Sequence, residues 1–263
     1  MKSSDLFIKC LENEGIEYIF GVPGEENADF LISLKKSKKI KFILTRHEQS
    51  AAFMAESYGK LTGKPGIAFV TRGPGACHAS VGVHISKQDS TPIILFVGQV
   101  ESSFYGKEAF QEINYESMFS KVAKWCHQIL NVEEIEHIIH KAFKVANTGR
   151  KGPVVISLPE DILSKKTTQK NLHIYQIKKP KIPINKIFEI KSLLERSKKP
   201  IIILGGGNWN KDSRLYIESF ALNNHLPVVT SFRRQDLINN RCKNFVGTLG
   251  TSVSPKLSLE AFL

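Results

Sequence analysis

Four short motifs combine residues that can bind or activate a small ligand. They are VPG at 22–24, RHE at 46–48, TRGPGA at 71–76 and GKEAFQE at 106–112. The carboxyl group of Glu48 can share a proton with a ligand nitrogen, and glycine turns let a backbone approach a flat ring closely. Each motif alone is weak, because Pro-Gly turns and glutamates that open helices are common structural features. Their chemistry therefore depends on whether the fold brings them together.

Short apolar runs alternate with segments of helical periodicity along the first part of the chain. Strands are expected at 16–21, 41–45, 66–70, 92–98 and 153–158. Helices are expected at 3–13 with Ser3 or Ser4 as cap, from 26, at 49–63, at 75–87 and at 135–146. This alternation predicts an α/β fold with a doubly wound parallel sheet. Such sheets bind ligands at the carboxyl ends of their strands, where the four motifs lie.

The chain is expected to divide at a stretch rich in lysine and proline. Residues 1–165 would form the sheet domain, 166–184 a linker and 185–263 a second, Rossmann-like α/β domain. In that domain, helices are expected at 185–196 and 213–223, and strands at 201–207 and 227–231. Two strands make an incomplete core, and the last residues, 260–263, resemble the middle of a helix. We therefore expect an N-terminal fragment of a longer protein.

Composition limits the class of protein, its possible binding partners and its cellular location. The chain has 263 residues, 41% of them hydrophobic, and a formal net charge of +12. Its lysines are scattered, without the aromatic-interleaved patch typical of nucleic-acid binding, so no nucleic-acid partner is expected. Four distant cysteines and the absence of metal-ligand spacing predict no metal site within the chain. Since no stretch has the length of a membrane span and no signal peptide is recognisable, we expect a cytoplasmic protein.

In this order and spacing, the four motifs resemble the pyrimidine-binding domain of the acetolactate synthase family of thiamine-diphosphate enzymes. Further matching stretches are DSTPIILFVGQV at 89–100 and GRKGPVVISLPEDI at 149–162. The resemblance covers nearly all of 1–163 and thins to the glycines at 205–207 in the second domain. It implies the α/β fold predicted above and a bound thiamine diphosphate.

The resemblance assigns a central role to Glu48. A glutamate at this position hydrogen-bonds atom N1′ of the cofactor's aminopyrimidine ring and thereby promotes loss of the C2 proton. We expect its side chain to lie in a largely apolar pocket. Contacts with the cofactor are implied for Pro23, Gly24, Glu48, Gly73, Pro74, Gly75 and Gln111.

Further residues match positions that line the substrate pocket or bind a second cofactor. Phe110 and Lys124 match pocket residues, with a core aromatic and a solvated lysine as the structural alternatives. Arg150 matches an FAD contact, and the second domain either binds FAD or serves as a spacer. The chain departs from the family at Arg72, which replaces a small serine, and at Cys77-His78, which replaces Thr-Asn. His78 and His84 are either proton carriers or packed or solvated side chains.

The implied activity is carboligation or decarboxylation of a 2-keto acid such as pyruvate, in a homodimer or homotetramer. The Mg²⁺ that anchors the diphosphate is expected to bind a Gly-Asp-Gly segment of a further domain, which this sequence lacks. We therefore expect the fragment alone to bind the cofactor poorly and to be inactive. Alternatives are a related enzyme for sulfoacetaldehyde or oxalyl-CoA and a non-catalytic nucleotide-binding, cofactor-binding or partner module. A glyoxylate carboligase is disfavoured, because that branch lacks a carboxylate at the position of Glu48.

Overall fold

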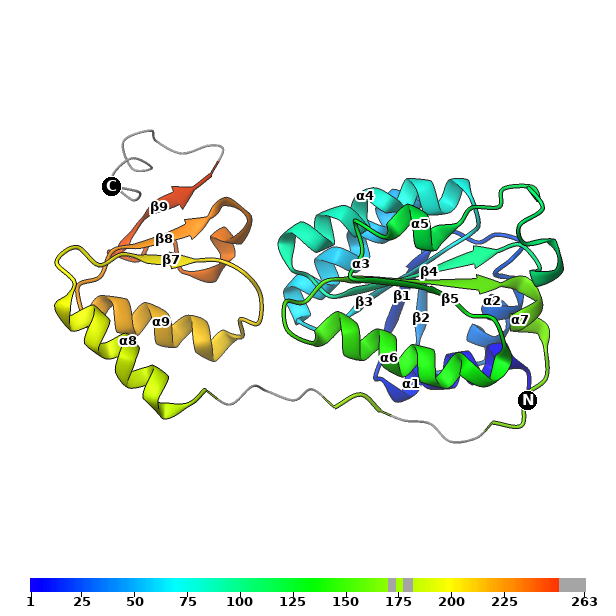
Figure 1. Ribbon diagram of the computed structural model, residues 1–263, viewed down its shortest axis with the longest axis horizontal. Coiled ribbons are helices and arrows are strands. Elements are labelled where there is room, and N and C mark those ends of the chain that lie inside the picture. Colours follow the sequence, from blue (N-terminus) through cyan, green and yellow to red (C-terminus); the bar gives the residue numbers. More distant parts are fainter. Residues whose placement is uncertain (170–173, 177–181, 251–263) are drawn as a thin grey trace. The chain divides into compact units, whose positions relative to one another are not determined.

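The chain forms two compact units, Met1–Ile177 and Lys178–Leu263 (Figure 1). The boundary between them lies within the expected linker at 166–184. The computed structural model describes residues 1–169, 174–176 and 182–250. Parts of the expected linker and the helix expected at 260–263 lie outside the described residues.

The first unit is built on a six-stranded parallel sheet with the order β2-β1-β3-β4-β6-β5. The strands are β1 (Tyr18–Gly21), β2 (Lys41–Leu44), β3 (Gly66–Val70), β4 (Ile93–Gln99), β5 (Trp125–Gln128) and β6 (Pro153–Pro159). Every residue of β3, β4 and β6 is buried, as expected where helices cover both faces of a sheet. The α/β prediction is therefore confirmed. The short strand β5 was not predicted, because its sequence WCHQ lacks an apolar run.

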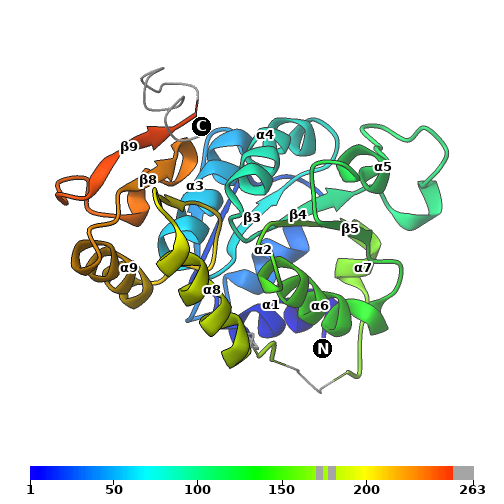
Figure 2. The ribbon, with the colours of Figure 1, turned by 60° about the vertical axis from the view of Figure 1, so that its left-hand side comes forward.

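Helices cover both faces of this sheet (Figures 1 and 2). They are α1 (Ser3–Asn13), α2 (Ala28–Leu34), α3 (Glu48–Thr62), α4 (Pro74–Asp89), α5 (Tyr115–Phe119), α6 (Ile135–Asn147) and α7 (Glu160–Ser164), with 3-10 turns η1 (Ser102–Phe104) and η2 (Val132–Glu134). One core cluster joins α1, α2, α6 and α7 to the sheet, and a second joins α3, α4 and α5 to its other face. The apolar stripes of the helices thus form two layers of core.

The start of α1 differs from the prediction. The residue before the helix is Lys2, which makes no side-chain cap, so neither serine is the N-cap. The hydroxyl of Ser3 donates to the carbonyl oxygen of Ile162, and the hydroxyl of Ser4 accepts from Ser33 at 2.9 Å. Both serines are buried, so tertiary contacts use the hydroxyls that a cap would have needed.

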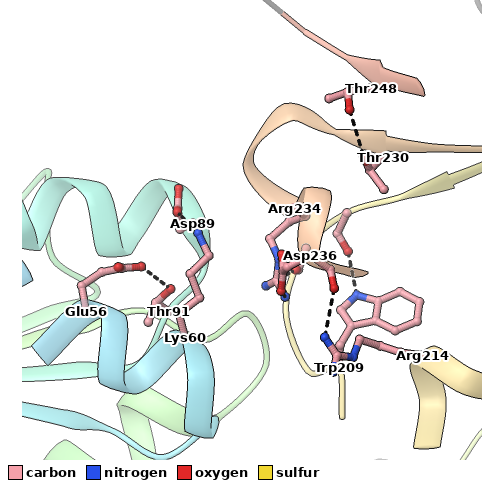
Figure 3. A network of polar contacts seen from close by, with 12 residues as sticks. Glu56, Lys60, Asp89, Thr91, Trp209, Arg214, Thr230, Arg234, Asp236 and Thr248 are labelled. Atoms are coloured by element: carbon pink, nitrogen blue, oxygen red, sulfur yellow. Dashed lines mark hydrogen bonds and ion pairs between the residues drawn. The ribbon is translucent and has the colours of Figure 1, made fainter. Parts of the chain in front are cut away.

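The second unit contains a three-stranded parallel sheet, β7-β8-β9. Its elements are α8 (Ile184–Arg196), β7 (Ile202–Leu204), α9 (Lys211–Asn223), β8 (Val228–Ser231), η3 (Phe232–Leu237) and β9 (Phe245–Leu249). The strand expected at 201–207 ends early because the glycines turn the chain, with a φ of 68° at Gly206. That turn is held by Trp209 Nε1, which donates to the oxygen of Gly205, and by Arg234, which donates to the oxygen of Gly206 (Figure 3).

None of the helices that the structure describes combines the length and the apolar composition needed to cross a membrane.

Candidate functional site

The strand order of the first sheet reverses between β1 and β3, which pair in parallel. Open parallel sheets bind ligands in the crevice outside such a switch point. Gly24, in the turn after β1, lies against Thr71, which follows β3: a Cβ atom on Gly24 would approach the Thr71 Cβ atom to 2.7 Å. The hydroxyl of Thr71 also donates to Glu26, and the Gly24 amide donates to Asn27 at 2.8 Å. The first motif is thus in close contact with the third through the side chain of Thr71.

Glu48 begins α3 and lies at the same edge of the sheet. Its side chain is only 13% exposed, and a Cβ atom on Gly75 would lie 3.6 Å from Glu48 Cγ and 3.7 Å from Oε1. The same atom would lie 3.1 Å from Thr71 Cγ2. The structure therefore gathers Gly24, Thr71, Gly75 and Glu48 into one continuous group, with the exposed prolines Pro23 and Pro74 beside the two glycine turns.

The surroundings of Glu48 are more polar than we expected. His78, on α4, places Nδ1 2.8 Å from Glu48 Oε2, and its side chain is 49% exposed. The ring of His47 stacks on that of His78, with 4.5 Å between the centroids and 29° between the planes. His47 is also the N-cap of α3, because its Nδ1 accepts the Gln49 amide at 3.2 Å. Ala51 and Ala52, which follow Glu48 on α3, are buried.

The turn at Gly73 is fixed by a buried tyrosine that the sequence analysis missed. The Gly73 amide donates to Tyr115 Oη at 2.8 Å, and this hydroxyl donates to the carbonyl oxygen of Gly98 at 3.3 Å. Burial raises the pKa of Tyr115, so the hydroxyl keeps the proton that it donates. Gly73 has a φ of 53°, and a Cβ atom there would lie 2.7 Å from the oxygen of Gln111. Gln111 therefore packs its backbone on this turn.

Arg72 organises the outer part of the site. Its guanidinium lies 2.7 Å from a carboxylate oxygen of the buried Glu26, and 6.0 Å from the ring centroid of Phe110. Phe110 is 76% exposed, which excludes the alternative that it is a core aromatic. The pKa of nearby Glu160 is raised, chiefly by burial. The charge of Arg72 is thus surrounded by the carboxylates of Glu25, Glu26 and Glu160.

The structure does not bring Lys124 or Arg150 to this group. Lys124 precedes β5, and its Nζ donates to two carbonyl oxygens in and after the last turn of α6, at 2.5 and 2.8 Å. Arg150 precedes β6, and its guanidinium donates to Ser90 Oγ at 2.8 Å and to the oxygen of Lys87 at 3.0 Å. Because all six strands are parallel, both residues lie at the amino edge of the sheet, opposite Glu48. Lys124 thus caps the end of α6 and lies at the edge of the sheet opposite Glu48.

His47, Glu48 and His78 form a grouping that no spacing in the sequence indicates. Each offers one ligand atom, and these three atoms lie within 4.8 Å of one another. The only signal in the sequence is the histidine at position 78, where the family resemblance predicts asparagine. His84, the other histidine of α4, is exposed and does not belong to this group.

Comparison with known proteins covers both units. Residues 1–118 match the family described as thiamine pyrophosphate enzyme, N-terminal TPP binding domain, and residues 187–260 match thiamine pyrophosphate enzyme, central domain. The chain is 40% identical over 238 residues to the acetolactate synthase large subunit of Buchnera aphidicola subsp. Schizaphis graminum, covering 88% of this chain and 42% of that protein. It is 34% identical over 266 residues to the Haemophilus influenzae acetolactate synthase large subunit, covering 95% and 45%. The chain therefore spans less than half the length of these relatives.

Proposed function

Because the chain belongs to the thiamine pyrophosphate enzyme family, we propose that it forms the cofactor-activating part of a carboligase or decarboxylase that acts on 2-keto acids. One observation carries the proposal. The largely buried carboxylate of Glu48 lies at the carboxyl edge of the sheet beside Gly75 in the turn after β3, and Thr71 of the same turn contacts Gly24 in the turn after β1. The names of the relatives favour acetolactate synthesis, with pyruvate as the substrate class.

The residues of the site fit the aminopyrimidine ring of thiamine diphosphate. Glu48 Oε2 is bonded to His78, while Oε1 lies on the side of Gly75 and can share a proton with a ring nitrogen. The turns at Pro23-Gly24 and Gly73-Pro74-Gly75 present backbone to a flat ring, since a glycine has no Cβ atom in the way. When bound, thiamine diphosphate supplies the acidic carbon at which 2-keto acids react.

The loop that carries Phe110 and Gln111 would complete the pocket. Gln111 packs on the Gly73 turn, and Phe110 is exposed near Arg72, so both side chains can contact a ligand at the carboxyl edge. We assign to Phe110 the exclusion of water from the reacting carbon and to Gln111 a polar contact with the cofactor. The position of Lys124 gives no support for a role in this pocket.

The remaining partners belong to the whole protein. Mg²⁺ would be held by a domain beyond the described residues, together with the diphosphate. Arg150, which matches an FAD contact, would have to exchange its present contacts with Ser90 and Lys87 in order to bind a flavin. We further propose a homodimer or homotetramer located in the cytoplasm.

The test is a pyruvate-consumption assay on the full-length gene product that contains this chain. The assay is run with thiamine diphosphate and Mg²⁺, with and without FAD. We expect pyruvate to be consumed with release of CO₂ and formation of acetolactate. Cofactor binding without consumption of pyruvate or another 2-keto acid would refute the proposed reaction and favour a non-catalytic binding module.

A further inference from the structure

We propose that His47, Glu48 and His78 bind a divalent transition-metal ion, such as Zn²⁺, at the mouth of the site. Two imidazoles and one carboxylate are the ligand types of three-ligand zinc sites, which leave a fourth position for water. Three ligand atoms of this trio lie within 4.8 Å of one another. Nitrogen ligands favour Zn²⁺ or Co²⁺ over Mg²⁺, which prefers oxygen.

Two of the three ligand atoms, on Glu48 and His78, are already held close to a coordinating geometry. Zinc bonds of about 2.0–2.2 Å place tetrahedral ligand atoms roughly 3.3 Å apart. His78 Nδ1 and Glu48 Oε2 are 2.8 Å apart, so a metal ion that replaces the shared proton needs only a small separation of the two side chains. Stacking of the His47 and His78 rings keeps the second imidazole beside the first.

His47 supplies the third ligand at a modest cost. Its Nδ1 now accepts the Gln49 amide at 3.2 Å, which is the long end of the range for such a bond. Coordination through Nδ1 would exchange this cap for a metal bond, whereas coordination through Nε2 leaves the cap in place. His47 is exposed and the His78 side chain is 49% exposed, so water can reach the open coordination position.

The site has a consequence for catalysis that rests on the proposed function. A metal ion bound to Glu48 Oε2 would draw electron density from the carboxylate, so that Oε1 would share a proton less readily with the cofactor ring. Zn²⁺ would therefore inhibit the enzyme. Metal binding itself needs no cofactor, so it is measured independently of the reaction.

The experiment titrates the 263-residue chain with Co²⁺, followed by visible absorption, and with Zn²⁺ by calorimetry in excess Mg²⁺. We expect one ion per chain, with a Co²⁺ spectrum of nitrogen and oxygen ligands. His78→Asn, Glu48→Gln and His47→Asn should each weaken binding by at least about tenfold. Asparagine at position 47 can still cap α3, so that variant keeps the fold.

Two matched variants control for other binding groups. His84→Asn removes an exposed histidine from the same helix, and Cys77→Ser removes the exposed thiol next to His78. Both should bind the metal like the unaltered chain, and circular dichroism should be unchanged in every variant. Unaltered binding by His78→Asn, or loss of binding in Cys77→Ser, would overturn the proposal.

Discussion

At Glu48, the two carboxylate oxygens have different surroundings. Oε2 is 2.8 Å from His78 Nδ1, and Oε1 lies on the side of Gly75. A side chain that is 13% exposed can thus keep one oxygen bonded within the protein and offer the other to a ligand. The backbone of the Gly73 turn, fixed by Tyr115, limits how far this arrangement can move.

Replacing Glu48 by glutamine in the whole protein tests its role in proton transfer. The amide keeps the shape and can still accept a hydrogen bond from His78, but it cannot give or take a proton. We expect kcat for pyruvate consumption to fall by about 10²–10⁴-fold. The thermal unfolding midpoint should change little. A variant with nearly full activity would show that another group handles the proton.

The buried thiol of Cys10 predicts a loss of stability in alkali. Burial raises the pKa of this thiol to about 12, whereas the pKa of an unfolded cysteine is about 8.5. Between these values the unfolded chain releases a proton that the folded chain keeps, so the free energy of unfolding falls as the pH rises. In Cys10→Ala, this fall should be shallower by about 1.4 kcal/mol per pH unit, measured by urea unfolding above pH 9. Cys77→Ala, which removes an exposed thiol, should leave the slope unchanged.

At the scale of elements, polar contacts join α3 to the last residue of α4 and to the segment that follows it. Lys60 Nζ lies 2.7 Å from Asp89 Oδ2, and the hydroxyl of Thr91 donates to Glu56 at 2.9 Å (Figure 3). These contacts lie far along α3 from Glu48, which begins the same helix. They fix the helix whose first residue carries the proposed chemistry.

Two lysines offer a matched comparison of ion pairs. Asp89 is 8% exposed and its partner Lys60 is 28% exposed, whereas Lys64 and Glu17 are 59% and 57% exposed. Lys60→Met should lower the free energy of unfolding by about 1–3 kcal/mol, because it leaves a buried carboxylate without this cation. Lys64→Met should change it by less than about 0.5 kcal/mol, since solvent screens exposed pairs. Equal effects in denaturant titrations would contradict this account of how α3 is fixed.

At the scale of the whole molecule, the two units differ in the size of their hydrophobic cores. The first unit has two large buried clusters, and the second has one small cluster. Within the described residues of the second unit, no side chain of α8 is buried, although the helix carries several large apolar residues. In the first unit, the N-terminus is also joined to the segment after α7, because Met1 and Thr167 exchange two backbone hydrogen bonds.

We therefore expect residues 1–169 to fold without the rest of the chain. Their thermal transition should be cooperative and should match the higher of two transitions in the 263-residue chain, because a larger buried area gives greater stability. Calorimetry of both proteins measures this. A broad transition or an unfolded spectrum for 1–169 would show that the second unit is needed.

The sequence by itself determined the elements whose pattern is local. The strands β3, β4 and β6 are continuous apolar runs, and α6 repeats its apolar residues at helical spacing. This pattern predicted the ends of all four elements to within one or two residues. The motif order also indicated the family and singled out Glu48. The strands and α6 depend on residues that are neighbours in the chain, whereas the family was indicated by the order of motifs spread over residues 22–112.

The tertiary structure decided which distant residues meet. It placed His78 against Glu48 and stacked it on His47, used Ser3 and Ser4 for packing instead of capping, and put Lys124 at the edge opposite the site. Strand order and helix packing set these contacts, and neither is encoded in local spacing. A side chain's partner is decided by which strand ends share an edge, which is a property of the whole sheet.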